Sequence, residues 1–216
     1  RPPTSVDELL PAHFGPEQLG RSPTALRAGP HALRVIGGDA SEPLVAATLA
    51  AASEVDGELE GFSVLGVGAG TAKLTLAEHR AVDVDLNEAF ARGLRDSGKV
   101  RHLAFMSAVG ADPEASATGG GGAGMSRYNR VKGESEAAVR ASGPAIVSVF
   151  RPAMIIGSQH TPWLLEKVLP IFSFVTPAKY KSITVEQIAR AMTATSLNTP
   201  TKSDLYHYPE MIALNR

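Results

Sequence analysis

The chain has 216 residues, a length that suits one domain with a substantial buried core. Hydrophobic residues make up 44% and charged residues 20%, which is typical of a globular protein and excludes a disordered one. Because the formal net charge is −1 and the basic residues are scattered, no nucleic-acid partner is indicated.

Several kinds of site are also excluded. There is no cysteine, hence no disulfide, thiolate metal ligand or cysteine nucleophile, which fits a cytoplasmic location; peripheral association with an organelle stays open. The longest apolar stretches, such as 168–175, are short and broken by Pro170, so no transmembrane segment is expected. The histidines form no i, i+4 pair with one another, so no metal site is predicted. The stretch 61–66 is one residue too long for the G-x-S-x-G turn of serine hydrolases.

The predicted elements alternate along the chain. Residues 1–30 are rich in Pro and Gly and are predicted to form an irregular surface segment. In chain order, strands are expected at 31–36, 61–66, 100–106 and 145–150, and helices at 43–53, 76–97, 126–142 and 185–197. This alternation predicts an α/β fold with a parallel sheet covered on both faces. The glycine-rich stretch 119–124 is expected to be a mobile loop, and residues from about 155 onward to include a small cap.

Tyr128 and Lys132 are the most informative pair. They lie four residues apart in a predicted helix, so both side chains share one helical face. A phenol ordinarily titrates at about 10, and a nearby cation favours its ionised form. The spacing alone is a weak motif, and a surface tyrosine with a solvated lysine is the alternative. Its surroundings strengthen it, because an apolar run ending in Ser107 precedes the pair and another ending in Arg151-Pro152 follows it.

This order resembles the extended, atypical short-chain dehydrogenase/reductases. Within them, Ser107 to Asp112, the run Tyr-Asn-Arg-Val-Lys-Gly-Glu from Tyr128 to Glu134, and Phe150 to Pro152 look like the Tat-interacting-protein-like oxidoreductases. The resemblance covers about residues 30–212. It implies a Rossmann-like, doubly wound parallel sheet with a small C-terminal cap, in a single NAD(P)-binding-type domain over residues 1–216. The implied activity is NADP(H)-dependent reduction or oxidation of a small carbonyl or alcohol.

The resemblance also implies catalytic roles. Tyr128 would be the acid or base, and Lys132 would hold the nicotinamide ribose and lower the pKa of the tyrosine. Ser107 is a candidate partner of the substrate carbonyl, although the usual catalytic serine of the family falls at Ala108. The helical asparagine common in the family is replaced by Asp83. These two departures favour the alternative, a catalytically weak, dinucleotide-sensing protein of the same fold.

Cofactor contacts are implied at several loops. The Asp39 carboxylate would accept from the adenine amino group, or it simply caps a turn. The loop 66–71 would pass close to the cofactor, with a structural turn or a phosphate-binding loop as alternatives. Arg1 could pair with the 2′-phosphate of NADP, so NADP is favoured and NAD stays open. The implied cofactor-binding residues are Asp39, Ala40, Leu65, Gly66, Val67, Ser107, Tyr128, Lys132, Arg151, Pro152, Ala153, Met154 and Ile155.

Other features leave alternatives. A dinucleotide fold normally opens with a strand, a glycine-rich turn and a helix, and nothing before His31 has that form. By the resemblance the chain begins after the second strand of the family, as part of a longer protein or as a variant with a damaged cofactor site. The apolar patch 163–169 is predicted to be cap core, with a partner or substrate surface as the alternative. A small-molecule substrate is expected, and a homodimer or a regulatory protein partner stays open.

Overall fold

The computed structural model describes residues 24–28, 31–36, 40–67, 71, 73–116, 123–156 and 177–215. The predictions for Arg1, Asp39, residues 119–122 of the glycine-rich stretch 119–124 and the apolar patch 163–169 lie outside the described residues. Residues 123–124 begin a helix, so the loop prediction is wrong for them. Within the described residues, no helix is both long enough and apolar enough to cross a membrane.

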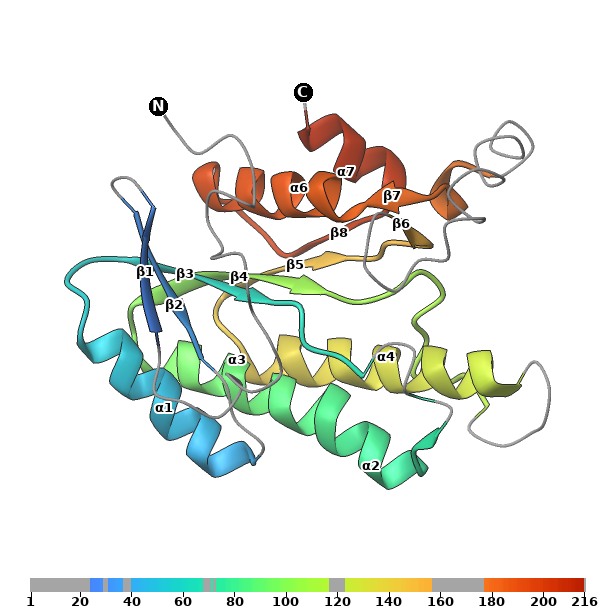
Figure 1. The fold of residues 1–216 in the computed structure, drawn as a ribbon, viewed down its shortest axis with the longest axis horizontal. Helices are drawn as coiled ribbons and strands as arrows, with labels where there is room; N and C mark the ends of the chain where they lie inside the picture. Colours follow the sequence, from blue (N-terminus) through green and yellow to red (C-terminus); the bar gives the residue numbers. More distant parts are fainter. Residues whose placement is uncertain are drawn as a thin grey trace.

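A four-stranded parallel sheet forms the centre of the fold (Figure 1). Its order is β3-β4-β5-β8, and each neighbouring pair is parallel. The strands are β3 (Leu59–Ser63), β4 (Val100–Met106), β5 (Ile146–Phe150) and β8 (Asp204–Tyr206). All five residues of β5 are buried, as expected for a strand covered on both faces.

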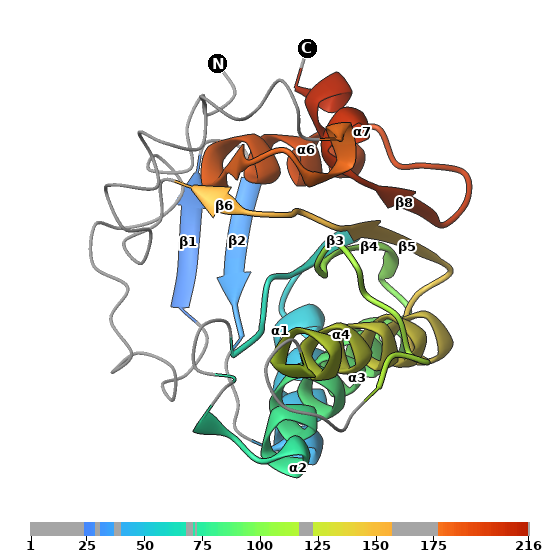
Figure 2. The ribbon, with the colours of Figure 1, turned by 90° about the vertical axis from the view of Figure 1, so that its right-hand side faces the viewer.

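Helices cover both faces of this sheet, as the alternation predicted (Figures 1 and 2). On one face lie α1 (Ser41–Ser53), α3 (Asn87–Asp96) and α4 (Ala123–Ser142), and on the other lie α6 (Val185–Leu197) and α7 (Tyr208–Leu214). Alternate residues of β4 face opposite layers: Leu103 and Phe105 pack with the α3–α4 side, whereas Ala104 packs with α6 and α7. The α/β, Rossmann-like fold class is therefore confirmed.

The predicted helix at 76–97 is one continuous helical segment with an irregular turn inside it. It begins as α2 (Leu76–Arg80), whose start is capped by the Thr75 side chain, and it ends as α3. Between them, Ala81–Leu86 forms a π-helical turn. Such turns occur frequently at functional sites, and this one carries the buried Asp83.

The N-terminal part differs from the prediction. β1 (Thr24–Ala28) and β2 (His31–Val35) form a separate antiparallel hairpin, which Figure 2 shows beside the central sheet. The irregular conformation predicted for residues 1–30 is thus wrong for residues 24–28, and the strand at 31–35 does not join the parallel sheet. Only two residues separate β1 from β2, too few for the crossover that a parallel pair requires.

The strand predicted at 61–66 ends at Ser63 and is not buried throughout. β3 is an edge strand, so Gly61 and Ser63 are buried while Phe62 is 39% exposed. Beyond β5, β6 (Ile155–Ile156) and β7 (Ile183–Thr184) form a short parallel pair. A 3-10 turn at Ala178–Tyr180 precedes β7. The C-terminal part therefore supplies a small additional sheet as well as β8, α6 and α7.

Candidate functional site

A cavity of about 140 Å³ lies just beyond the carboxyl ends of β3, β4 and β5. This edge of a parallel sheet is where ligands bind in open α/β folds. Pockets for whole drug-sized ligands have volumes of roughly 300–1,000 Å³, so this cavity suits one ring or the reacting part of a larger ligand. Its lining residues are Val64, Gly66, Met106, Ser107, Ala108, Tyr128, Lys132, Pro152, Ala153 and Ile155.

Backbone hydrogen bonds hold the loops at this cavity together. The Ser107 amide donates to the Phe150 carbonyl at 2.7 Å, and the Val109 amide donates to the Pro152 carbonyl at 2.8 Å. These bonds continue the parallel pairing of β4 with β5 past the ends of the strands. The pairing of β4 with β5 therefore places Ser107 and Pro152 beside each other.

The three predicted catalytic residues all border this one cavity. Ser107 is 4% exposed, and its hydroxyl oxygen has no hydrogen-bond partner among the described residues. Tyr128 and Lys132 project from α4 onto one face, and the Lys132 ammonium lies 5.8 Å from the centroid of the Tyr128 ring. A polar group in the cavity could therefore reach two hydroxyls and lie near an ammonium.

The predicted effect of Lys132 on Tyr128 is wrong. Burial of the phenol, with a smaller contribution from the Asp83 carboxylate, raises the pKa of Tyr128 to about 12 instead of lowering it. Burial is the main cause, and Lys132 does not offset it because a nearer anion is paired with it. Its Nζ lies 2.5 Å from Oδ1 of Asp83, in an ion pair whose two side chains are 6% and 0% exposed.

Asp83 is held in place from several sides. Its Oδ2 accepts a hydrogen bond from the Val67 amide at 3.0 Å, and its main-chain carbonyl accepts from the Asn87 amide group at 2.9 Å and the Ser135 hydroxyl at 2.5 Å. A Cβ at Gly66 would lie 2.8 Å from Nζ of Lys132, so the absence of a side chain there lets the loop approach the ion pair. The loop after β3, the π-helical turn and α4 therefore meet at this carboxylate.

His79 is part of the same cluster, although it was not predicted as a site residue from the sequence. Its ring stacks on the Tyr128 ring with centroids 6.2 Å apart, and its Nε2 lies 3.6 Å from Oδ2 of Asp83, too far for a hydrogen bond. Neither ring nitrogen has a hydrogen-bond partner within the described part of the chain. Burial lowers the pKa of His79, so the imidazole is neutral. The signal in the sequence was the i, i+4 spacing of His79 and Asp83 on a helix.

Only some of the predicted cofactor-binding residues line the cavity. Gly66, Pro152, Ala153 and Ile155 line the cavity together with Ser107, Tyr128 and Lys132. Leu65, Val67 and Met154 lie next to lining residues in the chain without lining the cavity themselves. Arg151 forms a bidentate ion pair with Glu136, at 2.8 and 2.7 Å, and Ala40 is exposed at the start of α1.

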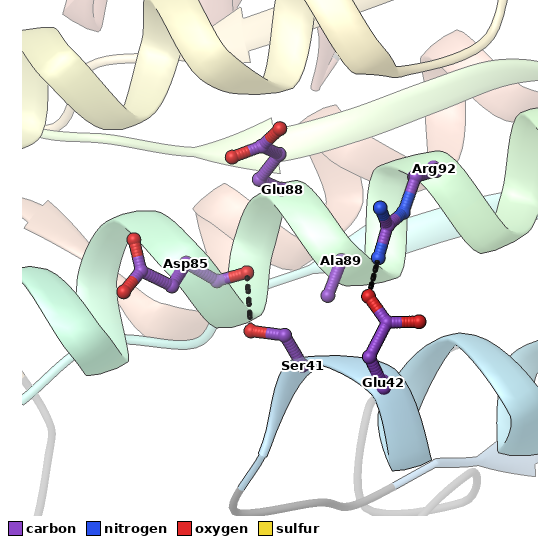
Figure 3. Close-up of a pocket in the computed structure, with 6 residues that line it drawn as sticks. All are labelled: Ser41, Glu42, Asp85, Glu88, Ala89 and Arg92. Atoms are coloured by element: carbon purple, nitrogen blue, oxygen red, sulfur yellow. Dashed lines mark hydrogen bonds and ion pairs between the residues drawn. The ribbon is translucent and has the colours of Figure 1, made fainter.

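A second hollow, of about 220 Å³, lies on the outer helical layer between α1 and the segment from the π-helical turn into α3 (Figure 3). Two pairs of its lining residues interact: Arg92 contacts Glu42 at 2.5 Å, and the Ser41 hydroxyl donates to the main-chain carbonyl of Asp85 at 3.4 Å. The Glu42 side chain is 80% exposed. Exposed, mutually paired charges are typical of a solvated helix surface, so the smaller cavity is the candidate site.

The comparisons with known proteins bear on the fold. No protein-family model and no curated protein sequence matches the chain. Among solved structures, UDP-N-acetylglucosamine 4-epimerase from Bacillus cereus superposes with a TM-score of 0.50 at 11% identity, over 75% of this chain and 61% of that one. A dTDP-4-dehydrorhamnose reductase from Clostridium acetobutylicum superposes with a TM-score of 0.50 at 13% identity, over 79% of this chain and 65% of that one. This chain thus spans less than two thirds of either protein, and the likeness shows a shared Rossmann-like fold.

Proposed function

We propose that the protein binds the nicotinamide end of NADPH or NADH at the Tyr128 cavity and reduces a small carbonyl compound to an alcohol. The observation that carries the proposal is the convergence of Ser107, Tyr128 and Lys132 on one cavity at the carboxyl edge of the sheet. The fold shared with a 4-epimerase and a dehydro-sugar reductase supports it. NADP as the preferred cofactor, the Tat-interacting-protein-like branch and a cytoplasmic location remain proposals that rest on the sequence.

The residues at the cavity fit a bound polar ring. The buried Ser107 hydroxyl has no partner in the described segments, and buried polar groups of this kind normally find one. The Lys132 ammonium reaches the same cavity. When bound, the cofactor would supply the hydride. The part of the protein is to hold the carbonyl oxygen near Tyr128 and to exclude water.

The protonation of Tyr128 favours reduction over oxidation. With a pKa of about 12, the phenol is neutral at physiological pH and is present as the proton donor that carbonyl reduction needs. A phenol is a stronger acid than an aliphatic alcohol, so proton transfer to the developing alkoxide is downhill. Alcohol oxidation would require the phenolate as base, and burial beside Asp83 makes that form scarce.

The test combines binding with turnover. Calorimetric titration with NADPH and NADH should show binding to both the parent and Tyr128→Phe, because the phenyl ring keeps the shape of the cavity. Turnover of small aldehydes and ketones should fall by about 100- to 10,000-fold in Tyr128→Phe, as expected when a general acid is lost. Tyr180→Phe is the matched control, since Tyr180 is 45% exposed and does not line the cavity. Unchanged turnover in Tyr128→Phe would reject Tyr128 as the acid.

A second function is favoured by one observation, the ion pair of Lys132 with Asp83. The Asp83 carboxylate balances the charge of the lysine that would assist Tyr128. The protein would then bind a dinucleotide as a sensor and catalyse hydride transfer poorly. The same titration separates the two functions. Cofactor binding without turnover of any tested carbonyl compound in the parent would support the sensor, and absence of binding would reject both.

A further inference from the structure

We propose that Asp83 is a positioning residue that withholds Lys132 from the Tyr128 hydroxyl and so favours the neutral phenol over the phenolate in the candidate site. The inference rests on the proposed function only in treating Tyr128 as the proton donor. Its test measures the phenol directly, in the absence of cofactor and substrate. Failure of this inference and failure of the proposed function can therefore be told apart.

Both members of the ion pair between Asp83 and Lys132 are buried. Asp83 is 0% and Lys132 is 5% exposed, and their charged atoms lie 2.5 Å apart. Buried charges are stable when they are paired, and their attraction is stronger there than in water. Each charge therefore largely cancels the field of the other at short range. Little positive potential from Lys132 remains to stabilise a phenolate.

The Asp83 carboxylate is held in this position by protein contacts alone. Oδ2 accepts a hydrogen bond from the Val67 amide at 3.0 Å, and Oδ1 is paired by charge with the Lys132 ammonium at 2.5 Å, without a hydrogen bond to a described residue. Asn87 and Ser135 anchor the main-chain carbonyl of the same residue. Rotation of the Asp83 side chain away from Lys132 would break the hydrogen bond from the Val67 amide, while Asn87 and Ser135 fix the backbone from which the side chain projects. The pairing is a built feature of the site rather than one of several side-chain positions.

The groups around Tyr128 also disfavour its ionisation. The neutral His79 ring stacks on the phenol from α2, Asp83 faces it from the π-helical turn, and Lys132 lies one turn along α4. Ser107 approaches from the end of β4. The other charged groups nearby are Arg127, which acts on His79, and Glu134, which is paired with Arg80 and Arg130. Ionising Tyr128 would place a second anion beside Asp83 with Lys132 as their shared cation, so the neutral phenol is favoured.

The experiment removes the charge of Asp83 and keeps its shape. In Asp83→Asn the side-chain carbonyl can still accept from the Val67 amide, but Lys132 loses its anion. The phenol should then titrate roughly one to three pH units lower than in the parent, because an opposite charge at short range favours the ionised form. The Tyr128 titration is followed by the ultraviolet absorbance of tyrosinate, as the difference between each protein and the same protein carrying Tyr128→Phe. Asp85→Asn, at an exposed position on the same turn, should cause no shift.

A double variant separates positioning from simple loosening of the structure. In Asp83→Asn with Lys132→Met the released cation is gone as well, so the downward shift should disappear. If Asp83 merely kept the site closed, both variants would admit water and shift equally; this result, or no shift in Asp83→Asn, overturns the proposal. The parent provides a further check that does not depend on Asp83→Asn folding. Titration of Tyr128 in the folded parent at or below its ordinary value of about 10 would also overturn it.

Discussion

Two buried histidines of this protein, His102 and His79, lie in opposite situations. Both are 0% exposed. His102 on β4 is fully partnered, with Nδ1 2.8 Å from Oε2 of Glu60 and Nε2 2.9 Å from Oγ of Ser148. His79 on α2 has no hydrogen-bond partner among the described residues and lies 3.6 Å from Asp83.

The difference separates a cluster that cross-links the sheet from one that borders the candidate site. The His102 network joins β3, β4 and β5, and its Ser148 hydroxyl is fully buried away from any substrate. Its serine, histidine and carboxylate therefore cross-link the sheet and do not form a hydrolase site. The His79 cluster leaves polar atoms unpartnered and borders a cavity through Tyr128 and Lys132. Buried polar groups without partners concentrate where a protein binds or reacts with something.

The largest expected effect tests how strongly the cluster beside the cavity depends on its ion pair. Lys132→Met leaves Asp83 as a buried anion without its cation, which should lower the free energy of unfolding by about 3–5 kcal/mol. The double variant Asp83→Asn with Lys132→Met contains no buried charge there, so it should regain most of that loss. Urea unfolding of the parent and both variants measures this. Equal stability of the single and the double variant would show that the pairing of charges is not what matters.

An intermediate effect tests the contrast between the two histidines. His102→Leu removes the hydrogen bonds of the ring to Glu60 and Ser148 and should cost about 1–3 kcal/mol, because the buried Ser148 hydroxyl loses a partner. His79→Leu removes a ring whose nitrogens have no described partner, so it should change the stability by less than about 1 kcal/mol. Leucine is the same replacement at both sites, which makes each variant the control for the other. Similar losses in the two variants would erase the distinction drawn between the clusters.

The smallest effect is a pH dependence that belongs to His79 alone. Burial lowers the pKa of His79 in the folded state below its unfolded value of about 6.5, so below that pH the unfolded state binds more protons. The parent should therefore lose stability relative to His79→Leu as the pH falls from about 6.5 toward the folded-state pKa, by at most about 1.4 kcal/mol per pH unit. Above pH 7 the difference between the two should be constant. Unfolding curves at several pH values measure it, and parallel curves through the acid range would contradict the assignment.

Much of the sheet and its helices could be predicted because the signals are local. Helical periodicity at 76–97 and 126–142 and apolar runs at 100–106 and 145–150 lie close to the observed α2–α3, α4, β4 and β5. The prediction failed at residues 24–35, where a hairpin forms, because chain length between strands and not strand propensity decides how they pair. The strand predicted at 61–66 extends too far, because the observed strand ends at Ser63. Its position at the edge of the sheet depends on which strands pair with it, and the local sequence does not determine that.

The candidate site was predicted in part for the same reason. Tyr128 and Lys132 share a helical face by spacing alone, and Ser107 follows a strand that any apolar run would indicate. Asp83 stood out only as a departure from the family pattern. Its partner could not be predicted, because Asp83 and Lys132 lie far apart in the chain and meet only where the π-helical turn packs on α4.

The order of strands and helices, and the residues that share each helical face, follow from the amino-acid sequence, since backbone geometry repeats over a few residues. The charge state of the site was decided by the folded protein. Whether Lys132 serves Tyr128 or Asp83, and whether a histidine is partnered or not, depends on which side chains are brought within about 3 Å by packing of distant elements. Burial in the folded protein disfavours the charged form of each group. It therefore raises the pKa of Tyr128 and lowers the pKa of His79.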